Sequence, residues 1–395
     1  MSSTVSKFSN RLPPNRAPNA LSVRLAGLEK GADYIDLTES NPTRAGFDYP
    51  DGLLRDLASP RALTYDPHPF GLIAAREAVA ADHQRRGMRV DPGRIVLTAS
   101  TSEAYSWLFK LLCNPGDHVL VPAPSYPLFE HLTRLDGVDA VPYALDYHTR
   151  WEVDILRVRR AMTDRTRAVL AVSPNNPTGS YLKEGELRLL DELCSQRGVA
   201  LVVDEVFADY GLYVPPDYVT DAALRTRALS FTLGGLSKSV GLPQVKLGWI
   251  VVGGEQAERA RALAALELIA DSYLSVSTPV QVAAPDLLAQ GGVIRAGIML
   301  RLRENLRALD ACVQQYRSCQ LLACEGGWYA VVRVPATRSE EEIVLDLLDR
   351  ERILVHPGYF FDFPREAYLV ISLLPAPEVF ADAAARMLHL TAGSL

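Results

Sequence analysis

Cysteine is scarce in this chain of 395 residues. There are only five, and no two of them have the CxxC spacing of a metal site: Cys113, Cys194, Cys312, Cys319 and Cys324. An odd number of scattered cysteines also does not indicate a disulfide framework. We therefore expect free, reduced thiols and no metal centre.

Long hydrophobic runs and basic runs are also missing. No segment approaches the 18 apolar residues of a membrane-spanning helix, and the first ten residues lack the apolar core of a secretory signal. The formal net charge is −6, and no long run of lysine or arginine indicates a nucleic-acid-binding surface. These absences predict a cytoplasmic protein that binds neither membranes nor nucleic acids.

Apolar residues, in contrast, are plentiful. They make up 48% of the sequence, enough to bury a large core in one large domain or in two. There is no internal repeat and no low-complexity linker. Prolines at 13, 14 and 18 prevent the first twenty residues from being helical throughout, so we predict an extended arm. The predicted parts are the arm with part of a small domain (1–45), a large domain (46–290) and a small C-terminal domain (291–395).

Strand-like and helix-like patterns alternate along the chain, as they do in α/β folds. Seven β-rich runs are expected to form a mostly parallel sheet: residues 95–98, 118–121, 140–143, 168–172, 200–203, 228–232 and 247–252. Only fourteen residues join the last two, which leaves little room for a crossover helix, so the seventh strand is predicted to be antiparallel. Helices are predicted at 102–112, 126–135, 184–197 and 255–273.

A long amphipathic run at residues 293–316 leads to a smaller α/β unit. Its predicted strands lie at 328–334 and 368–374, and its predicted helices lie at 339–350 and 378–390. The sequence therefore predicts a large domain built on a seven-stranded, mostly parallel sheet, accompanied by a smaller α/β domain.

Lys238 follows the sixth predicted strand and lies between Ser237 and Ser239. At the end of a buried strand, among small neighbours, a lysine can approach an electrophile closely, and a lowered pKa lets it form a Schiff base. Taken alone, the position also fits a solvated surface charge, as most lysines are. The residues that follow the other strands favour the first interpretation.

A carboxylate and an amide follow two other predicted strands. Asp204 ends the apolar run at 199–203, and Asn176 lies in the segment 173–179 after the fourth strand. In open α/β sheets, ligands bind outside the carboxyl ends of such strands. A lysine that forms an imine, a carboxylate that keeps a pyridine nitrogen protonated and an amide that donates to a phenolic oxygen all suit one ligand, pyridoxal 5′-phosphate.

A turn after the first strand is suited to the phosphate of that ligand. Ser100, Thr101 and Ser102 open a helix, where free N–H groups, the helix dipole and the hydroxyl groups favour an anion. The alternative is a plain serine cap with Glu103 in the first turn. Tyr126, after the second strand, is placed to stack on the pyridine ring; simple packing is the alternative there.

The motifs at 175–179, 204–205 and 237–238 resemble those of the class I and II aminotransferases of fold type I. The resemblance extends over about residues 20 to 390. It implies that Lys238 carries the cofactor and that Asp204 pairs with the pyridine nitrogen.

The same resemblance implies three further contacts to the cofactor. Asn176 would lie near the phenolic oxygen, and Ser237 would be among the cofactor-binding residues. Tyr65 resembles the tyrosine that reaches the phosphate of a neighbouring subunit, which implies a homodimer with shared active sites. An ordinary turn tyrosine is the alternative for Tyr65.

Three positions on the cofactor side depart from the family pattern. Phe207 stands where a tyrosine usually donates to the phenolic oxygen, and losing such a donor removes about 1.5–3 kcal/mol; Tyr210 is one candidate to replace it. Lys246 stands where an arginine usually binds the phosphate. Its ammonium group keeps the positive charge but lacks the planar, bidentate donors of a guanidinium. Gly235 stands where a phosphate-binding serine is common. Together these departures suggest a reduced hold on the phosphate.

The fourth departure, Val370, concerns the substrate. The family usually has an arginine there that pairs with the substrate's α-carboxylate, and valine cannot replace a bidentate guanidinium. Either another cation meets the carboxylate or the substrate lacks one. Arg44, beside the family-like turn at Asn41, is the first candidate and Arg333 the second, although both fit surface charges. His356 either borders the substrate or is a packing histidine.

Three classes of function are compatible with these residues. The first is an aminotransferase that moves an amino group between an amino acid, or amine, and a 2-oxo acid, with Lys238 as Schiff-base lysine and general acid/base. The second is a lyase, cyclase or decarboxylase with the same cofactor, which the missing arginine keeps open. The third, a cofactor-binding regulator, needs a DNA-binding domain for which we see no room and no basic helix. We favour the aminotransferase, with a small amino donor and a 2-oxo acid as its partners.

Overall fold

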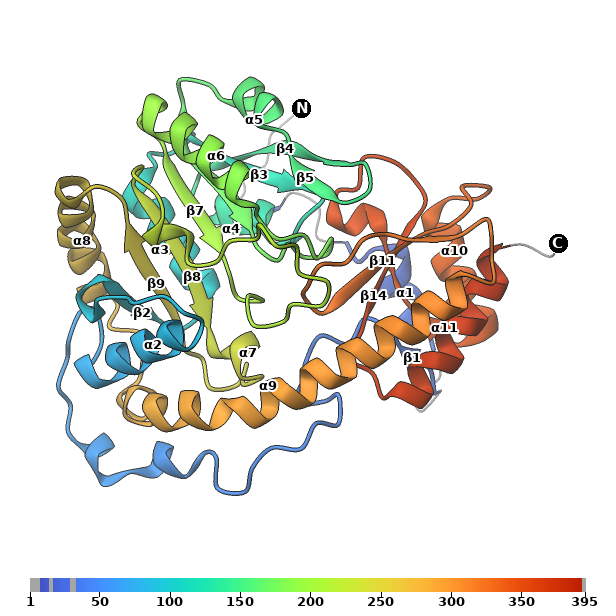
Figure 1. The fold of residues 1–395 in the computed structure, drawn as a ribbon, viewed down its shortest axis with the longest axis horizontal. Helices are drawn as coiled ribbons and strands as arrows, with labels where there is room; N and C mark the ends of the chain where they lie inside the picture. Colours follow the sequence, from blue (N-terminus) through green and yellow to red (C-terminus); the bar gives the residue numbers. More distant parts are fainter. Residues whose placement is uncertain (1–7, 14–16, 29–32, 393–395) are drawn as a thin grey trace.

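The computed structural model describes residues 8–13, 17–28 and 33–392, arranged as Figure 1 shows. An eight-stranded sheet forms the centre of the larger domain, in the order β2-β9-β8-β7-β6-β3-β4-β5. Its strands are β2 (Ile95–Thr98), β3 (His118–Ala123), β4 (Asp139–Tyr147), β5 (Trp151–Val153), β6 (Thr166–Val172), β7 (Ala200–Asp204), β8 (Ser230–Gly235) and β9 (Gly248–Gly253). The predicted α/β class is confirmed.

Five neighbouring strands, from β8 to β4 in the sheet order, run parallel, whereas β9 is antiparallel to both β8 and β2. The antiparallel seventh strand of the prediction is therefore confirmed. The connection from β8 to β9 holds only the short helix α7 (Leu236–Ser239), so the chain reverses instead of crossing over. The sheet has one strand more than the seven expected, because β5 has only three residues and is too short to show a pattern.

Helices cover both faces of this sheet, and its strands are apolar on both faces for that reason. Val96, Phe231 and Ile250 pack in the layer of α3 and α8, whereas Leu97 and Trp249 point to the layer of α2 and α9. The helices of this domain are α2 (Ile73–Arg85), α3 (Thr101–Leu112), α4 (Phe129–Leu135), α5 (Ile155–Ala161), α6 (Glu184–Arg197), α8 (Gln256–Asp271) and α9 (Thr278–Val313). The four helices predicted before residue 275 are all present.

Helix α9 runs along the lower part of the molecule in Figure 1, from beneath α2, past α7, to the smaller domain. Its 36 residues begin at Thr278, well before the predicted run at 293–316, and they include Pro285. Pro285 and the glycine pair that starts at Gly291 weaken the helical signal of the first half, so the sequence pattern indicated only the second. The proposed domain boundary after residue 290 lies inside this continuous helix.

The smaller domain contains an antiparallel sheet in the order β10-β11-β14-β13, and its two predicted strands are β11 and β14. Strand β1 pairs with β12, so the segment near the N-terminus belongs to the same unit as the C-terminal part. The predicted arm lies partly outside the described residues. The elements are α1 (Ala20–Ala26), β1 (Ile35–Asp36), β10 (Gln320–Leu321), β11 (Tyr329–Arg333), α10 (Glu340–Asp346), β12 (Ile353–Leu354), β13 (His356–Pro357), β14 (Tyr368–Ser372) and α11 (Pro377–Ala392).

Short helical turns complete the structure. The predicted helix at 339–350 is α10 followed by a π-helical turn, because the hydrogen-bond pattern widens at its end. The turns are η1 (Arg55–Ala58), η2 (Pro60–Leu63), η3 (Pro92–Arg94), η4 (Ala222–Leu224), η5 (Leu347–Glu351) and η6 (Gly358–Phe361).

A buried ion pair joins the smaller domain to the sheet domain. Nζ of Lys183, at the start of α6, lies 3.0 Å from Oε2 of Glu325, which precedes β11. Lys183 also donates to the carbonyl of Trp151 (3.0 Å), and Glu325 accepts from the N–H of Tyr181 (2.8 Å). Removing one partner of a buried pair typically costs about 3–5 kcal/mol, so the segment around Glu325 is firmly fixed.

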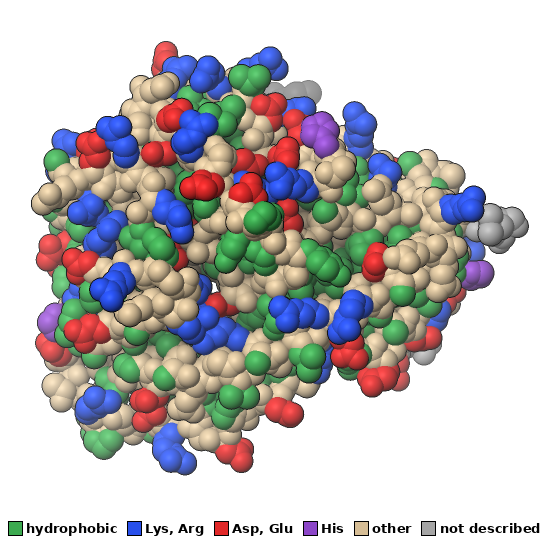
Figure 2. All heavy atoms as spheres, viewed as in Figure 1, with side chains coloured by type: hydrophobic (Ala, Val, Ile, Leu, Met, Phe, Trp, Pro, Cys, Tyr) green, Lys and Arg blue, Asp and Glu red, His purple; other side chains and the backbone are tan. Residues whose placement is uncertain are grey.

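The surface is mixed in charge on the face seen in Figure 2, where lysine and arginine side chains are interspersed with aspartate and glutamate. Within the described ranges, no helix is both long enough and apolar enough to cross a membrane. Exposed large hydrophobic side chains recur in the segment that includes η1 and η2, which pack on α9. They are Leu54, Leu63, Tyr65 and Ile73.

Candidate active site

A cavity of about 290 Å³ lies at the carboxyl ends of β6, β7 and β8 and at the start of α3. Nine of the ten residues predicted to bind the cofactor line it: Ser100, Thr101, Ser102, Tyr126, Asn176, Asp204, Ser237, Lys238 and Lys246. The structure therefore brings together the ends of strands that lie far apart in the sequence, as the parallel sheet predicts.

Lys238 lies on the short helix α7 and is held at both ends. Its carbonyl oxygen accepts a hydrogen bond from the hydroxyl of Tyr210 (2.6 Å), and its Nζ lies 4.6 Å from the ring centre of Trp328 and 5.4 Å from that of Phe207. Burial lowers the pKa of Lys238 to about 8, although the nearby carboxylate of Asp204 opposes this change. A usable fraction of the amine is therefore uncharged near neutral pH, as a nucleophile requires.

Asp204 is the last residue of β7 and is almost fully buried. Its Oδ2 accepts from the hydroxyl of Tyr105 (2.9 Å), and its Oδ1 accepts from the N–H of Val206 (3.1 Å). Burial raises the pKa of Asp204 to about 6, against the effects of these two hydrogen bonds and of Lys238. Each carboxylate oxygen has a second lone pair, so the group can accept one more strong donor from the cavity.

Two adjacent asparagines after β6 have different roles. Asn175 belongs to the scaffold: its amide donates to the carbonyl of Pro124 and to Oγ1 of Thr178, and its Oδ1 accepts from Ser125. Asn176 faces the cavity, and its buried Oδ1 has no hydrogen-bond partner among the described residues. A buried amide oxygen in this state has capacity for a donor.

The turn before α3 combines a cap with free donors. Ser100 caps the helix, because its hydroxyl accepts from the N–H of Glu103 (3.2 Å), and the carboxylate of Glu103 accepts from the N–H of Ala99 (2.6 Å). The Ser100 side chain therefore caps the helix, and its hydroxyl hydrogen remains available as a donor. The first N–H groups of a helix have no partner within it, so Thr101 and Ser102 still offer donors to an anion. The turn also packs on Gly248, where an added Cβ would lie 3.1 Å from the nitrogen of Thr101.

Lys246 and Tyr126 also line the cavity. Lys246 is exposed and has a left-handed backbone (φ 62°), which a non-glycine residue rarely adopts. Tyr126 packs edge-on against Phe129, with ring centres 6.1 Å apart. Its proposed stacking on a cofactor ring stays a prediction.

The three residues proposed for substrate binding do not line the cavity. The side chain of Arg44 is 75% exposed and lies 3.8 Å from Glu39. Asn41 uses its Oδ1 to accept from Thr43, and its neighbour Ser40 lines the cavity instead. Their proposed contact with a substrate stays a prediction.

His356 is on β13, directly opposite Val370 of β14. Burial lowers its pKa to about 4, so the ring is neutral, and it packs against Phe360 and Phe361. These contacts favour the packing interpretation. Arg333 is exposed at the end of β11 and is also not among the cavity residues.

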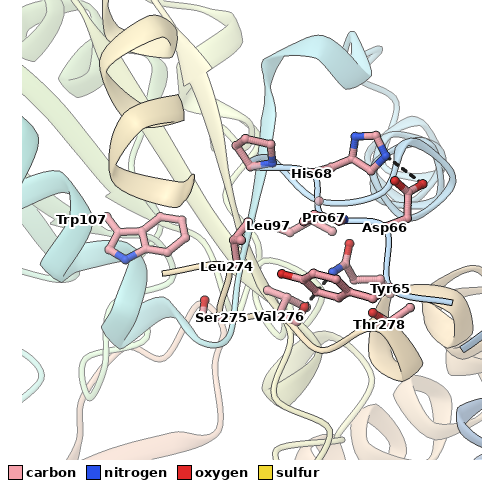
Figure 3. A pocket seen from close by; sticks show the side chains of 13 residues that line it. Tyr65, Asp66, Pro67, His68, Leu97, Trp107, Leu274, Ser275, Val276 and Thr278 are labelled. Carbon is pink, nitrogen blue, oxygen red and sulfur yellow. Dashed lines mark hydrogen bonds and ion pairs between the residues drawn. The ribbon is translucent and has the colours of Figure 1, made fainter. Parts of the chain in front are cut away.

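Tyr65 lies outside the main cavity, in a smaller hollow of about 30 Å³ that Figure 3 shows. Its side chain is 72% exposed, and the hollow also contains Trp107, Thr278 and the hydrogen-bonded pair Asp66 and His68 (3.1 Å). An exposed ring at this place fits a contact with a second subunit, which stays a prediction.

Several cavity residues were missed in the sequence. Tyr105 lies one helical turn after Thr101 and so shares its face, a spacing that could have indicated it. Ser40 and Tyr329 come from the N-terminal segment and from β11, and no local pattern connects them to the strand ends.

Comparison with known proteins agrees with this geometry. The profile of the family "Aminotransferase class I and II" matches residues 34–379. The glutamate-pyruvate aminotransferase AlaA of Escherichia coli K12 is 30% identical over 356 residues, which cover 88% of this chain and 87% of AlaA. The alanine aminotransferase of Mycobacterium tuberculosis H37Rv is 29% identical over 376 residues, covering 91% and 85%. A crystal structure of an Escherichia coli aminotransferase has 29% identity and a TM-score of 0.84, covering 98% of both chains.

The chain belongs to the class I and II aminotransferase family. It is an enzyme that transfers amino groups, and its family uses pyridoxal 5′-phosphate for this reaction. The structure adds that nine of the ten residues expected to bind this cofactor line one cavity.

Proposed function

We propose that this aminotransferase binds pyridoxal 5′-phosphate in the 290 Å³ cavity and uses it to exchange an amino group between an amino acid and a 2-oxo acid. The observation that carries the proposal is the meeting of Lys238, Asp204 and Asn176 in that cavity. When bound, the cofactor supplies an electrophilic carbonyl and a ring that withdraws electrons. All other functions in the site belong to side chains of the protein.

The unsatisfied groups of the cavity fit this cofactor. Asn176 faces the cavity, its buried Oδ1 has no hydrogen-bond partner among the described residues, and Asp204 has a free lone pair on each oxygen. Asp204 would hold a proton on the pyridine nitrogen, and the NH2 group of Asn176 would donate to the phenolic oxygen. The phosphate would be held by residues of the α3 turn together with Ser237 and Lys246, which line the same cavity. The residues of that turn are Ser100, Thr101 and Ser102.

Lys238 is the group that binds the cofactor and then moves protons. With a pKa of about 8, its amine can take a proton from the substrate's α-carbon. It would then deliver that proton to the C4′ carbon of the cofactor. The surrounding rings of Phe207 and Trp328 keep this part of the cavity apolar, which excludes water from the proton transfer.

We infer that pyruvate or a 2-oxo acid of similar size is the acceptor. The names of three curated relatives support this choice: glutamate-pyruvate aminotransferase, alanine aminotransferase, and the arginine–pyruvate transaminase AruH of Pseudomonas aeruginosa, which is 27% identical over 374 residues. Val370 stands where an arginine usually binds the substrate's carboxylate. Because this contact is missing, we name the donor only by its class, an amino acid.

We also propose a homodimer with shared active sites. The exposed ring of Tyr65 and the neighbouring exposed Leu63 support it, because large apolar side chains of this kind favour burial against a second subunit. Sedimentation should give twice the mass of one chain. Tyr65→Phe should weaken cofactor binding without changing that mass, whereas a monomer in solution would contradict the proposal.

A half-reaction separates the aminotransferase from the lyase alternative, which Val370 keeps in view. The cofactor-loaded protein is mixed with single amino acids, in the absence of any oxo acid, and its absorbance is followed. An aminotransferase converts the cofactor stoichiometrically to its pyridoxamine form and releases one oxo acid per site, and pyruvate then restores the aldehyde form. A lyase or decarboxylase leaves the cofactor in the aldehyde form and releases product continuously, which would overturn the proposal.

A further inference from the structure

Three aromatic residues surround Lys238 without being part of the reaction chemistry. Trp328 packs edge-on against both Phe207 and Tyr210, with ring centres 5.3 and 5.2 Å apart. We call Phe207, Tyr210 and Trp328 the aromatic cradle. All three are buried. Tyr210 contacts the carbonyl oxygen of Lys238, whereas Trp328 and Phe207 both lie against its amine.

The cradle combines residues from both domains. Phe207 and Tyr210 follow β7 in the larger domain, whereas Trp328 directly precedes β11 of the smaller one. The chain before Trp328 is fixed to the larger domain by the Lys183–Glu325 pair and by the hydrogen bond from the N–H of Gly327 to the carbonyl of Tyr210 (2.9 Å). The indole is therefore held in place from outside the cavity.

Trp328 can act on the lysine only through its ring face and its packing. Its Nε1 is buried without a hydrogen-bond partner among the described residues, so no hydrogen bond explains its position. An ammonium group 4.6 Å from the ring centre, in contrast, is within the range of a cation–π contact, and tryptophan makes the strongest of these contacts.

Phe207 fits the same interpretation. A tyrosine hydroxyl at this position would be directed at a cofactor oxygen, but phenylalanine presents only its ring, 5.4 Å from Nζ of Lys238. Tyr210 does not replace that hydroxyl, because its own hydroxyl binds the carbonyl of Lys238. The residue that departs from the family pattern here, Phe207, therefore presents its ring to the amine of Lys238.

We propose that Trp328, supported by Phe207, is a positioning residue that holds the charged amine of Lys238 in the cavity through its ring face. The proposal rests on the proposed function, in which this amine receives and returns a proton. It also gives the smaller domain a direct part in orienting the lysine, through the segment that contains Trp328.

Other groups that act on the amine are known from the structure. The titratable side chains that share its cavity are Tyr105, Tyr126, Asp204, Lys246 and Tyr329. Burial lowers the pKa of Lys238 and Asp204 raises it. A ring face that stabilises the charged form also raises the pKa of the lysine, so removing the ring should lower it.

The pKa of Lys238 can be measured in the cofactor-free protein by competitive labelling with acetic anhydride over pH 6–11, with the labelled peptide quantified by mass spectrometry. Trp328→Leu should lower this pKa by about 0.5 to 1.5, the equivalent of a desolvated cation–π contact. Trp328→Phe, which keeps a ring, should lower it by less than half as much. Phe207→Leu should have a smaller effect than Trp328→Leu, because its ring is farther from Nζ.

Trp107→Leu is the matched control, since Trp107 is an equally buried indole that packs on Tyr273 and not on Lys238. This variant should leave the pKa of Lys238 unchanged. An unchanged or raised pKa in folded Trp328→Leu overturns the proposal. If that variant does not fold, the proposal is decided by Phe207→Leu and Trp328→Phe, and unchanged pKa values in both overturn it.

A kinetic readout complements the labelling. In the cofactor-loaded enzyme, Trp328→Leu should lower kcat about tenfold with little change in KM, because the amine is misplaced for proton transfer while substrate contacts remain. Trp328→Phe should restore part of kcat. Because labelling needs neither cofactor nor turnover, a failure of the proposed aminotransferase reaction would leave the pKa result intact, so the two failures are distinguishable.

Discussion

The two halves of the active-site region are built in different ways. The cofactor half consists of the ends of β6, β7 and β8 with the turn before α3, and its predicted residues meet in one cavity. The substrate half is formed by the N-terminal segment and the smaller domain, and Asn41, Arg44 and His356 do not reach the cavity. The predicted residues of the first half therefore share one cavity, and those of the second do not.

The difference has a physical reason. Strand ends of one parallel sheet lie side by side whatever the connecting loops do, so a functional group placed there is positioned by the backbone ladder. The substrate half depends on how separate elements pack, for example on β13 placing His356 opposite Val370.

The largest expected effect is on the cofactor half. Lys238→Ala should lower turnover by about 10⁴-fold or more, since both the nucleophile and the general base are lost. It should also abolish the borohydride-reducible link to the cofactor. Peptide mass spectrometry checks the position of this link, with Lys246→Ala as the control that retains it. A reduced adduct on any other lysine contradicts the assignment.

Asp204→Asn should have the next largest effect, lowering turnover by about 10² to 10³-fold while some cofactor stays bound. A neutral amide does not keep a proton on the pyridine nitrogen, so the ring withdraws electrons less strongly. Steady-state kinetics and the cofactor absorbance of the purified variant test this. Turnover close to that of the wild type would mean that the partner of the ring nitrogen is another residue.

The same substitution should stabilise the cofactor-free protein at high pH. The pKa of Asp204 is raised from 3.8 to about 6, so the folded protein favours the protonated carboxyl group. The contribution of this group to the free energy of unfolding is therefore fully present below pH 3.8 and is lost as the pH rises through 6. At pH 8 the ionised carboxylate costs up to about 3 kcal/mol, which asparagine avoids. Urea unfolding should show this gain in the free energy of unfolding at pH 8 and almost none near pH 4. An equal gain at both pH values would show that titration of Asp204 is not its cause.

The smallest effect is expected in the substrate half. An exposed ion pair such as that of Arg44 and Glu39 contributes at most about 1 kcal/mol, so Arg44→Ala should change KM for amino acids by less than about fivefold. Arg333→Ala serves as the control for removing an exposed arginine. An increase in KM of about 30- to 150-fold would instead mean that Arg44 binds the carboxylate, as losing about 2–3 kcal/mol implies.

The sequence alone determined the parts of this protein that depend on local pattern and on the parallel sheet. Strand periodicity located seven of the eight strands, and the short link around Lys238 predicted the reversal into β9. Residues at the carboxyl ends of parallel strands lie close together. For this reason the sequence alone predicted that Lys238, Asp204 and Asn176 bind one cofactor. The sequence did not predict β5, because three residues are too few to show a pattern. It did not predict the first half of α9, because Pro285 weakens the helical signal there.

Only the tertiary structure decided which distant side chains meet these residues. Three contacts join segments that share no sequence pattern. Tyr105 donates to Asp204, Tyr210 donates to the carbonyl of Lys238, and Trp328 lies against the amine of Lys238. The same holds for the exposure of Arg44, which depends on the packing of a loop. Hydrogen bonds and ring contacts across such separations arise from the relative placement of whole elements, and a one-dimensional pattern carries no information about that placement.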